Sequence, residues 1–146
     1  MWVVEGVVAG VLAGIFMGIA SEIGYRFNVV KSHLIVIDGA FALRLLQRED
    51  NRFATYVLGI FIHLITSVIF GVIYVIIARL LDFDTRLVAA IVPYVVFLWL
   101  AMLLAALPIA GQGIMGRKIG RTVIAEQLVL HIIFGIGFWW ALGLLS

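Results

Sequence analysis

Four long stretches of this sequence carry no charged side chain, and they constrain the fold more than any other feature. A helix needs about 20 mostly apolar residues to cross the hydrocarbon core of a bilayer. We therefore predict an all-α polytopic membrane protein, in which residues 1–146 form one transmembrane domain, a four-helix bundle. The predicted helices lie near 2–24, 54–80, 87–107 and 122–145, and Pro108 is expected to end the third.

Composition agrees with a membrane protein and excludes several kinds of site. The apolar fraction is 65% and the charged fraction 12%, whereas soluble domains average about 45–50% and about 25%. The absence of cysteine excludes disulfides, iron–sulfur clusters and cysteine nucleophiles. The net charge of +2 is too small to predict a nucleic-acid partner. The opening MWVVE has no basic segment, so we expect no cleavable signal peptide.

The segment SHLIVIDGAFALRLLQRED lies between the first two predicted spans and, unlike them, mixes charged with apolar residues. On a helical wheel, His33, Arg44, Gln47 and Arg48 share one face, and leucines and isoleucines lie elsewhere. This pattern predicts an interfacial helix near 32–50 that lies on the cytoplasmic membrane surface. Ser32 is its expected N-cap.

The basic residues predict which side of the membrane each connection occupies. Because consecutive spans alternate in direction, the first and third connections lie on one side, and the termini and the second connection lie on the other. The first side has eight of the ten Lys and Arg residues, and only Arg79 and Arg86 lie on the other. The positive-inside rule then places connections one and three in the cytoplasm and both termini outside, in a multi-pass protein of the cell membrane.

A strip of glycines with four-residue spacing runs along the first predicted helix at Gly6, Gly10, Gly14 and Gly18. Such residues lie on one side of a helix, and each costs about 1 kcal/mol relative to alanine. The spacing predicts a glycine zipper at which another helix packs closely. Approach of a lipid or of a flat cofactor is the alternative.

Two histidines lie at the same depth in the predicted bundle. His63 and His131 each follow the cytoplasmic start of their helix by about nine residues, or roughly 13 Å. Ionisable groups at such depth are candidates for function. Each stands in a row of small or polar residues at four-residue spacing: Gly59, Ser67 and Gly71 beside His63, and Gln127 and Gly135 beside His131. We expect the three glycines and Ser67 to be helix-packing positions.

Three interpretations of the histidines stay open. The two imidazoles could be the axial ligands of haem b, with Gly14 and Trp99 lining the macrocycle at the same level. They could instead be structural, each bonded to a hydroxyl or carbonyl group, with Ser67 the natural partner of His63. Proton transfer or contact with a quinone is the third interpretation. A metal site with only these two ligands would be under-coordinated.

Short motifs resemble a known group of proteins. HLITSVIFGVIY and HIIFGIGFWW are similar to the histidine-then-FG pattern in helices two and four of YagU-like four-helix membrane proteins. The opening VVAGVLAGIFMG and the segment PIAGQGIMG are also similar to that group. The resemblance implies four membrane helices with an intramembrane histidine on two of them, and it implies no defined activity.

These observations favour a small non-enzymatic membrane subunit. No nucleophile–base arrangement or nucleotide-binding loop is visible, so we predict no catalysis. Little mass lies outside the bilayer and small-residue faces are abundant, which suits an accessory role against larger membrane partners or by self-association. The alternative is a haem b electron-transfer subunit with His63 and His131 as ligands. A small transporter or channel is less favoured, since no charged residue is expected near the midplane.

Overall fold

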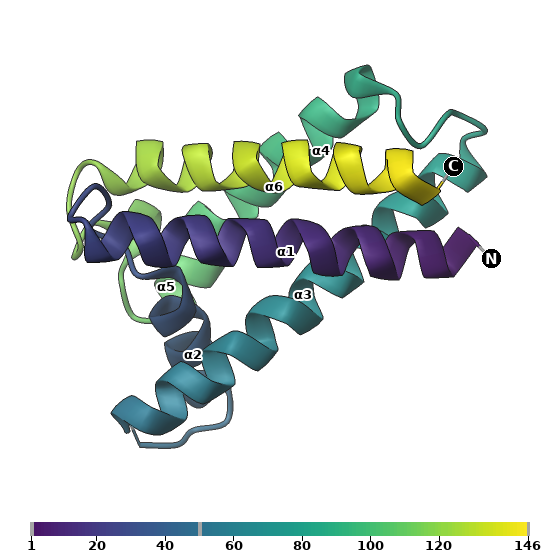
Figure 1. Ribbon diagram of the computed structural model, residues 1–146. Coiled ribbons are helices and arrows are strands. Elements are labelled where there is room, and N and C mark those ends of the chain that lie inside the picture. Colours follow the sequence, from purple (N-terminus) through teal and green to yellow (C-terminus); the bar gives the residue numbers. More distant parts are fainter. Residues whose placement is uncertain (1, 50, 146) are drawn as a thin grey trace.

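The computed structural model describes residues 2–49 and 51–145, and these residues contain helices and no strand. The bundle is formed by four long helical spans with a shorter helix, α2, beside them (Figure 1). The elements in chain order are α1 (Trp2–Arg26), α2 (Leu34–Leu45), α3 (Arg52–Leu80), α4 (Val88–Ala101), the π-helical turn η1 (Met102–Ala106), α5 (Leu107–Ile109), the 3₁₀ turn η2 (Ile114–Gly116) and α6 (Val123–Leu145).

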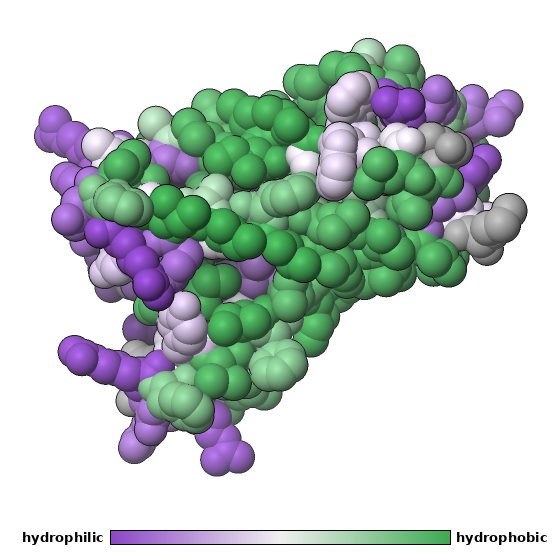
Figure 2. Space-filling model, viewed as in Figure 1, coloured by the Kyte–Doolittle hydropathy of each residue, from purple (hydrophilic) through white to green (hydrophobic). Residues whose placement is uncertain are grey.

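The surface of the bundle has an apolar belt between two polar ends (Figure 2). The start of α1 and the end of α6 lie at one end, and the connections α1–α2 and α5–α6 lie at the other (Figure 1). Four spans are long and apolar enough to cross a membrane: α1, α3, the continuous segment Val88–Ile109, and α6. This arrangement is that of a multi-pass membrane protein.

The glycine strip of α1 faces α3. A Cβ atom built on Gly6 would lie 2.8 Å from the carbonyl oxygen of Gly71, and one built on Gly71 would lie 2.9 Å from the Cα of Gly10. A Cβ on Gly10 would meet the carbonyl group of Ser67. The two backbones therefore touch here, and only residues without a side chain permit this distance.

Farther along α1 the strip faces side chains instead of backbone. A Cβ on Gly14 would lie 2.7 Å from the Cβ of Ser67, and one on Gly18 would lie 3.5 Å from the ring of His63. The axes of α1 and α3 thus diverge from the terminal end of the bundle toward the opposite end (Figure 1). The divergence leaves room for the imidazole of His63 between the two helices.

Helix α2 packs against the outward-leaning half of α3 (Figure 1). Gly39 of α2 approaches the carbonyl group of Thr55, and Gly59 of α3 approaches that of Ile35, so closely that neither glycine has room for a Cβ atom. Seven of the 12 residues of α2 are buried. The helix between the first two spans is therefore an integral part of the packing, and its position at a membrane surface stays a prediction.

The start of α2 corrects the predicted cap. The N-cap is His33, whose Nδ1 accepts a hydrogen bond from the Val36 N–H at 3.2 Å. Ser32 is fully buried, and its hydroxyl donates to Glu126 of α6 instead. The predicted polar face is also wrong in part: α2 ends at Leu45, so Gln47 and Arg48 lie beyond the helix.

The third span includes Pro108 and ends at Ile109, one residue after it. Proline has no N–H, and in a regular α-helix its ring clashes with the carbonyl group four residues earlier. The π-helical turn Met102–Ala106 lies immediately before it, and the Leu107 N–H donates to the carbonyl of Met102, five residues back. This wider turn accommodates the proline, and such turns often occur at functional sites.

Helix α6 packs against α1 and α4. A Cβ on Gly135 would lie 2.9 Å from Cγ2 of Val95 in α4, so this glycine is a packing position of α6. At the terminal end an aromatic cluster surrounds the buried Tyr74, whose ring centroid lies 5.2 Å from that of Phe138 and 5.1 Å from that of Tyr94. Aromatic side chains thus fill the core at the terminal end of the bundle. The cavity described below lies toward the opposite end.

Candidate functional site

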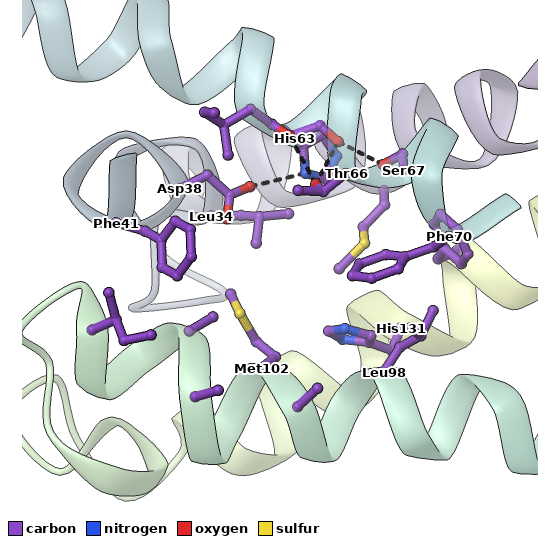
Figure 3. Close-up of a pocket in the computed structure, with 17 residues that line it drawn as sticks. Leu34, Asp38, Phe41, His63, Thr66, Ser67, Phe70, Leu98, Met102 and His131 are labelled. Atoms are coloured by element: carbon purple, nitrogen blue, oxygen red, sulfur yellow. Dashed lines mark hydrogen bonds and ion pairs between the residues drawn. The ribbon is translucent and has the colours of Figure 1, made fainter. Parts of the chain in front are cut away.

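A cavity of about 270 Å³ lies inside the bundle between α2, α3, the α4–α5 segment and α6 (Figure 3). Most of its wall is apolar, and Phe41, Phe70 and Met102 extend into it (Figure 3). Five polar side chains also border it: Asp38, His63, Thr66, Ser67 and His131. An apolar pocket with a few convergent polar groups is the usual form of a small-molecule site.

Ala105 of η1 and Ile109 of α5 line the cavity, and both are exposed residues. Ile62 and Thr66 form the facing wall on α3. Both walls belong to spans of the apolar belt.

His63 is held between two helices by both of its ring nitrogens. Nε2 lies 2.9 Å from the carbonyl oxygen of Gly14 in α1, and Nδ1 lies 3.0 Å from Oδ2 of Asp38 in α2. A carbonyl oxygen can only accept, so Nε2 carries hydrogen and donates it. The imidazole therefore links α1, α2 and α3 at the point where α1 and α3 diverge.

One proton must lie between Asp38 and His63. With Nε2–H directed at Gly14, the Nδ1–Oδ2 contact of 3.0 Å needs a hydrogen from one of the two groups. Either a protonated Asp38 donates to the Nδ1 lone pair, or an imidazolium donates to the carboxylate. Burial raises the pKa of the Asp38 carboxyl, and the hydrogen bond to His63 opposes this effect. The pair thus holds a proton beside the cavity.

His131 presents one ring nitrogen to the cavity. Its Nδ1 lies 2.7 Å from the carbonyl oxygen of Gln127, one turn earlier in α6. Nδ1 is therefore the N–H donor, and in the neutral ring Nε2 is left with a lone pair. The ring extends into the cavity opposite His63 (Figure 3). The two histidines that the sequence places at one depth thus border the same space.

The two hydroxyl groups of the cavity wall are directed at backbone. The Ser67 hydroxyl donates to the carbonyl of His63 at 2.7 Å, and the Thr66 hydroxyl donates to the carbonyl of Ile62 at 2.8 Å. Ser67 is therefore not the ring partner of His63 that the sequence predicts. Neither hydroxyl has a spare hydrogen, although each retains lone pairs.

The arrangement does not fit bis-histidine haem ligation. Both ring nitrogens of His63 are engaged, by Asp38 and by Gly14, so neither offers a lone pair to iron. Trp99, the predicted neighbour of a macrocycle, does not line the cavity, and its Nε1–H donates to the carbonyl of Ile124 at 3.1 Å. Gly14 contributes its carbonyl oxygen to His63 instead of a flat surface to a cofactor.

Beside the cavity, Glu126 ties the first connection to α6. Its Oε2 accepts hydrogen bonds from the backbone N–H groups of Lys31 and Ser32 and from the Ser32 hydroxyl, at 2.8–3.0 Å. Its Oε1 accepts from the Thr122 hydroxyl at 2.6 Å. The adjacent Gln127 donates to the same serine oxygen at 3.1 Å. This network fixes the chain just before α2 and so helps to position Asp38.

Asp38 is the functional candidate that the sequence analysis did not identify. The segment around it reads as a surface helix, and a surface carboxylate needs no partner. One signal was present: Asp38 is the only charge between Lys31 and Arg44, within the apolar run LIVIDGAFAL. A single carboxylate in such a run, followed by a glycine that permits close packing, indicates a buried and paired group.

Among the residues that the structure describes, no three His, Asp or Glu side chains converge as a metal site would require. The chain was compared with protein-family models, with curated proteins and with solved structures, and none of these comparisons gave a match.

Proposed function

We propose that this chain is a small integral membrane protein that binds a compact hydrophobic molecule within its bundle and does not catalyse a reaction. The observation that carries the proposal is the cavity of about 270 Å³, bordered by Asp38, His63 and His131 and enclosed between membrane-spanning helices. Its volume lies just below the range of about 300–1,000 Å³ for drug-sized pockets, which suits a ligand of one or two rings.

Two further features support binding over a purely structural role. Well-packed protein interiors contain few voids larger than a water molecule. A hydrogen bond with a purely structural role is therefore expected to be surrounded by packed side chains. Here the Asp38–His63 pair instead borders an open volume, and the π-helical turn with Met102 and Ala105 forms its opposite wall. The hydroxyls of Thr66 and Ser67 are committed to backbone carbonyls, which argues against their acting as nucleophiles.

The accessory role expected from the sequence is compatible with this proposal. A subunit that packs against larger membrane partners, or against copies of itself, can also hold a small molecule. The exposed apolar side chains of the belt, such as Phe61 and Ile136, would contact either lipid or a partner helix.

Adding bulk to the wall of the cavity tests the proposal. Ala105 lines the cavity and is exposed, so Ala105→Trp adds bulk there without displacing a core side chain. We expect the variant to lose saturable binding of tritiated 1-methylnaphthalene by about tenfold or more, equivalent to about 1.4 kcal/mol. The measurement is equilibrium dialysis of protein in lipid nanodiscs, after subtraction of empty nanodiscs.

Leu104→Trp is the matched control, since the neighbouring residue is 53% exposed and does not line the cavity. This variant should bind 1-methylnaphthalene as the wild type does. Absence of saturable binding by the wild type, or equal binding by both tryptophan variants, would contradict the proposal.

We further propose that connections one and three face the cytoplasm and that both termini face outward. The support is the concentration of basic residues in connections one and three, which lie at the same end of the bundle (Figure 1). Lys118 in connection three and Asp84 in connection two are both exposed and lie at opposite ends of the bundle.

Cysteine labelling tests this orientation without background, because the sequence has no cysteine. A membrane-impermeant maleimide should label Asp84→Cys in intact cells and should label Lys118→Cys only after permeabilisation. The reverse pattern would invert the proposed orientation.

A further inference from the structure

We infer that the ligand of the cavity is a compact lipophilic amine in its protonated form. This inference rests on the proposed function and names the chemistry of the ligand. The polar groups of the cavity wall have lone pairs that can still accept hydrogen bonds, but no hydrogens left to donate. The inference follows from this imbalance.

Each polar group of the wall has already used its hydrogen. His63 donates Nε2–H to Gly14, and its Nδ1 shares a proton with Asp38. His131 donates Nδ1–H to the carbonyl of Gln127, and the hydroxyls of Thr66 and Ser67 donate to carbonyls of α3. A ligand that can only accept, such as a quinone, therefore finds no donor among these side chains.

The acceptors that stay available face the same space. Asp38 uses Oδ2 to contact His63, and its side chain borders the cavity, which leaves Oδ1 for a ligand. The neutral His131 ring offers the Nε2 lone pair from the opposite wall. A ligand with several N–H groups can donate to both, and a carboxylate oxygen is the stronger acceptor for a cation.

The remaining wall suits the rest of such a molecule. Phe41 and Phe70 extend into the cavity (Figure 3), and aromatic faces attract cations as well as apolar groups. Alkylamines are protonated near pH 7, as lysine is. When the shared proton lies on His63, the pair as a whole is neutral, and the second oxygen of the Asp38 carboxylate is a charged acceptor for the ammonium group. Because the cavity lies between helices long and apolar enough to span a membrane, its ligand is expected to partition into lipid.

The test compares three probes of the same ring size in nanodiscs, with empty nanodiscs subtracted: 1-(aminomethyl)naphthalene, 1-methylnaphthalene and 1,4-naphthoquinone. The first has a protonated amine, the second has no polar group and the third has only acceptors. We expect the amine to bind about tenfold more tightly than either of the others, because a charge-assisted hydrogen bond contributes more than apolar contact alone.

Variants assign this preference to the proposed acceptors. Asp38→Asn should reduce the ratio of amine to methyl affinity to about one, because the amide cannot supply a negative charge. His131→Phe retains a ring of similar size without the acceptor, and it should reduce the same ratio about threefold. Asp84→Asn, which removes a carboxylate from the exposed second connection, should leave the ratio at its wild-type value.

The outcomes separate this inference from the proposed function. Saturable binding of 1-methylnaphthalene with no preference for the amine, or a preference for the quinone, would overturn the inference and leave the cavity as a binding site. An amine preference that persists in both Asp38→Asn and His131→Phe would place the cation elsewhere and would also overturn it. If no naphthalene binds in a saturable manner, the proposed function itself fails.

Discussion

Replacing Gly10 with leucine is expected to separate α1 from α3 and to prevent recovery of a folded bundle. A Cβ atom at Gly10 would lie 3.0 Å from the carbonyl carbon of Ser67 and 3.1 Å from the Cα of Val68. These are backbone atoms, so no rotamer change can relieve the overlap. The further atoms of leucine have no space at this contact, and the helices must move apart along their closest segment.

The destabilisation of the bundle should increase with the size of the side chain at position 10. Gly10→Ala gains about 1 kcal/mol in helix propensity, which offsets part of an overpacking cost of about 1–3 kcal/mol. Alanine has the same Cβ atom against the backbone of α3, so it should already destabilise the bundle, and leucine should destabilise it more severely. The measurements are monodispersity in detergent and the midpoint of heat unfolding followed by circular dichroism.

Val4→Phe is the control for added bulk, since Val4 lies on the same helix and is 59% exposed. This variant should be recovered and should unfold near the wild-type temperature. If Gly10→Leu were tolerated equally well, the close contact of α1 with α3 would have no part in stability.

The spans were predictable because the signal is local. A charge-free stretch of about 20 residues predicts a membrane-spanning helix by itself. This prediction does not depend on which helices become neighbours. The convergence of His63 and His131 could also be anticipated, because two helices that run in the same direction place residues of equal depth at one level. Both histidines do border one cavity.

The partners of these groups were not predictable, because they depend on how separate elements pack. Asp38 reaches His63 only because α2 packs against α3, and the hydrophobic pattern of its segment suits a surface helix equally well. Ser32 has the side chain of an N-cap, but its hydroxyl donates to Glu126 of a distant helix and its oxygen accepts a hydrogen bond from Gln127. The hydroxyl is thus directed at α6, and His33 accepts the capping hydrogen bond of α2 in its place.

Glu126→Ala is accordingly expected to release the first connection and to destabilise the bundle by about 1–3 kcal/mol, the cost of leaving buried donors without an acceptor. The substitution leaves the N–H groups of Lys31 and Ser32 and the hydroxyls of Ser32 and Thr122 without their common acceptor. Because this connection leads into α2, the loss should also loosen Asp38 from His63.

Hydrogen exchange provides the specific measurement for this variant. The amides of Lys31 and Ser32 donate to the carboxylate, so their exchange should accelerate in Glu126→Ala more than that of amides in α3. Glu5→Gln is the matched control: Glu5 has one contact, with the exposed Arg79 at 3.8 Å, and such surface pairs contribute about 0–1 kcal/mol. Unchanged protection at Lys31 and Ser32 in Glu126→Ala would show that the connection is held by other contacts, and that Glu126 does not position α2.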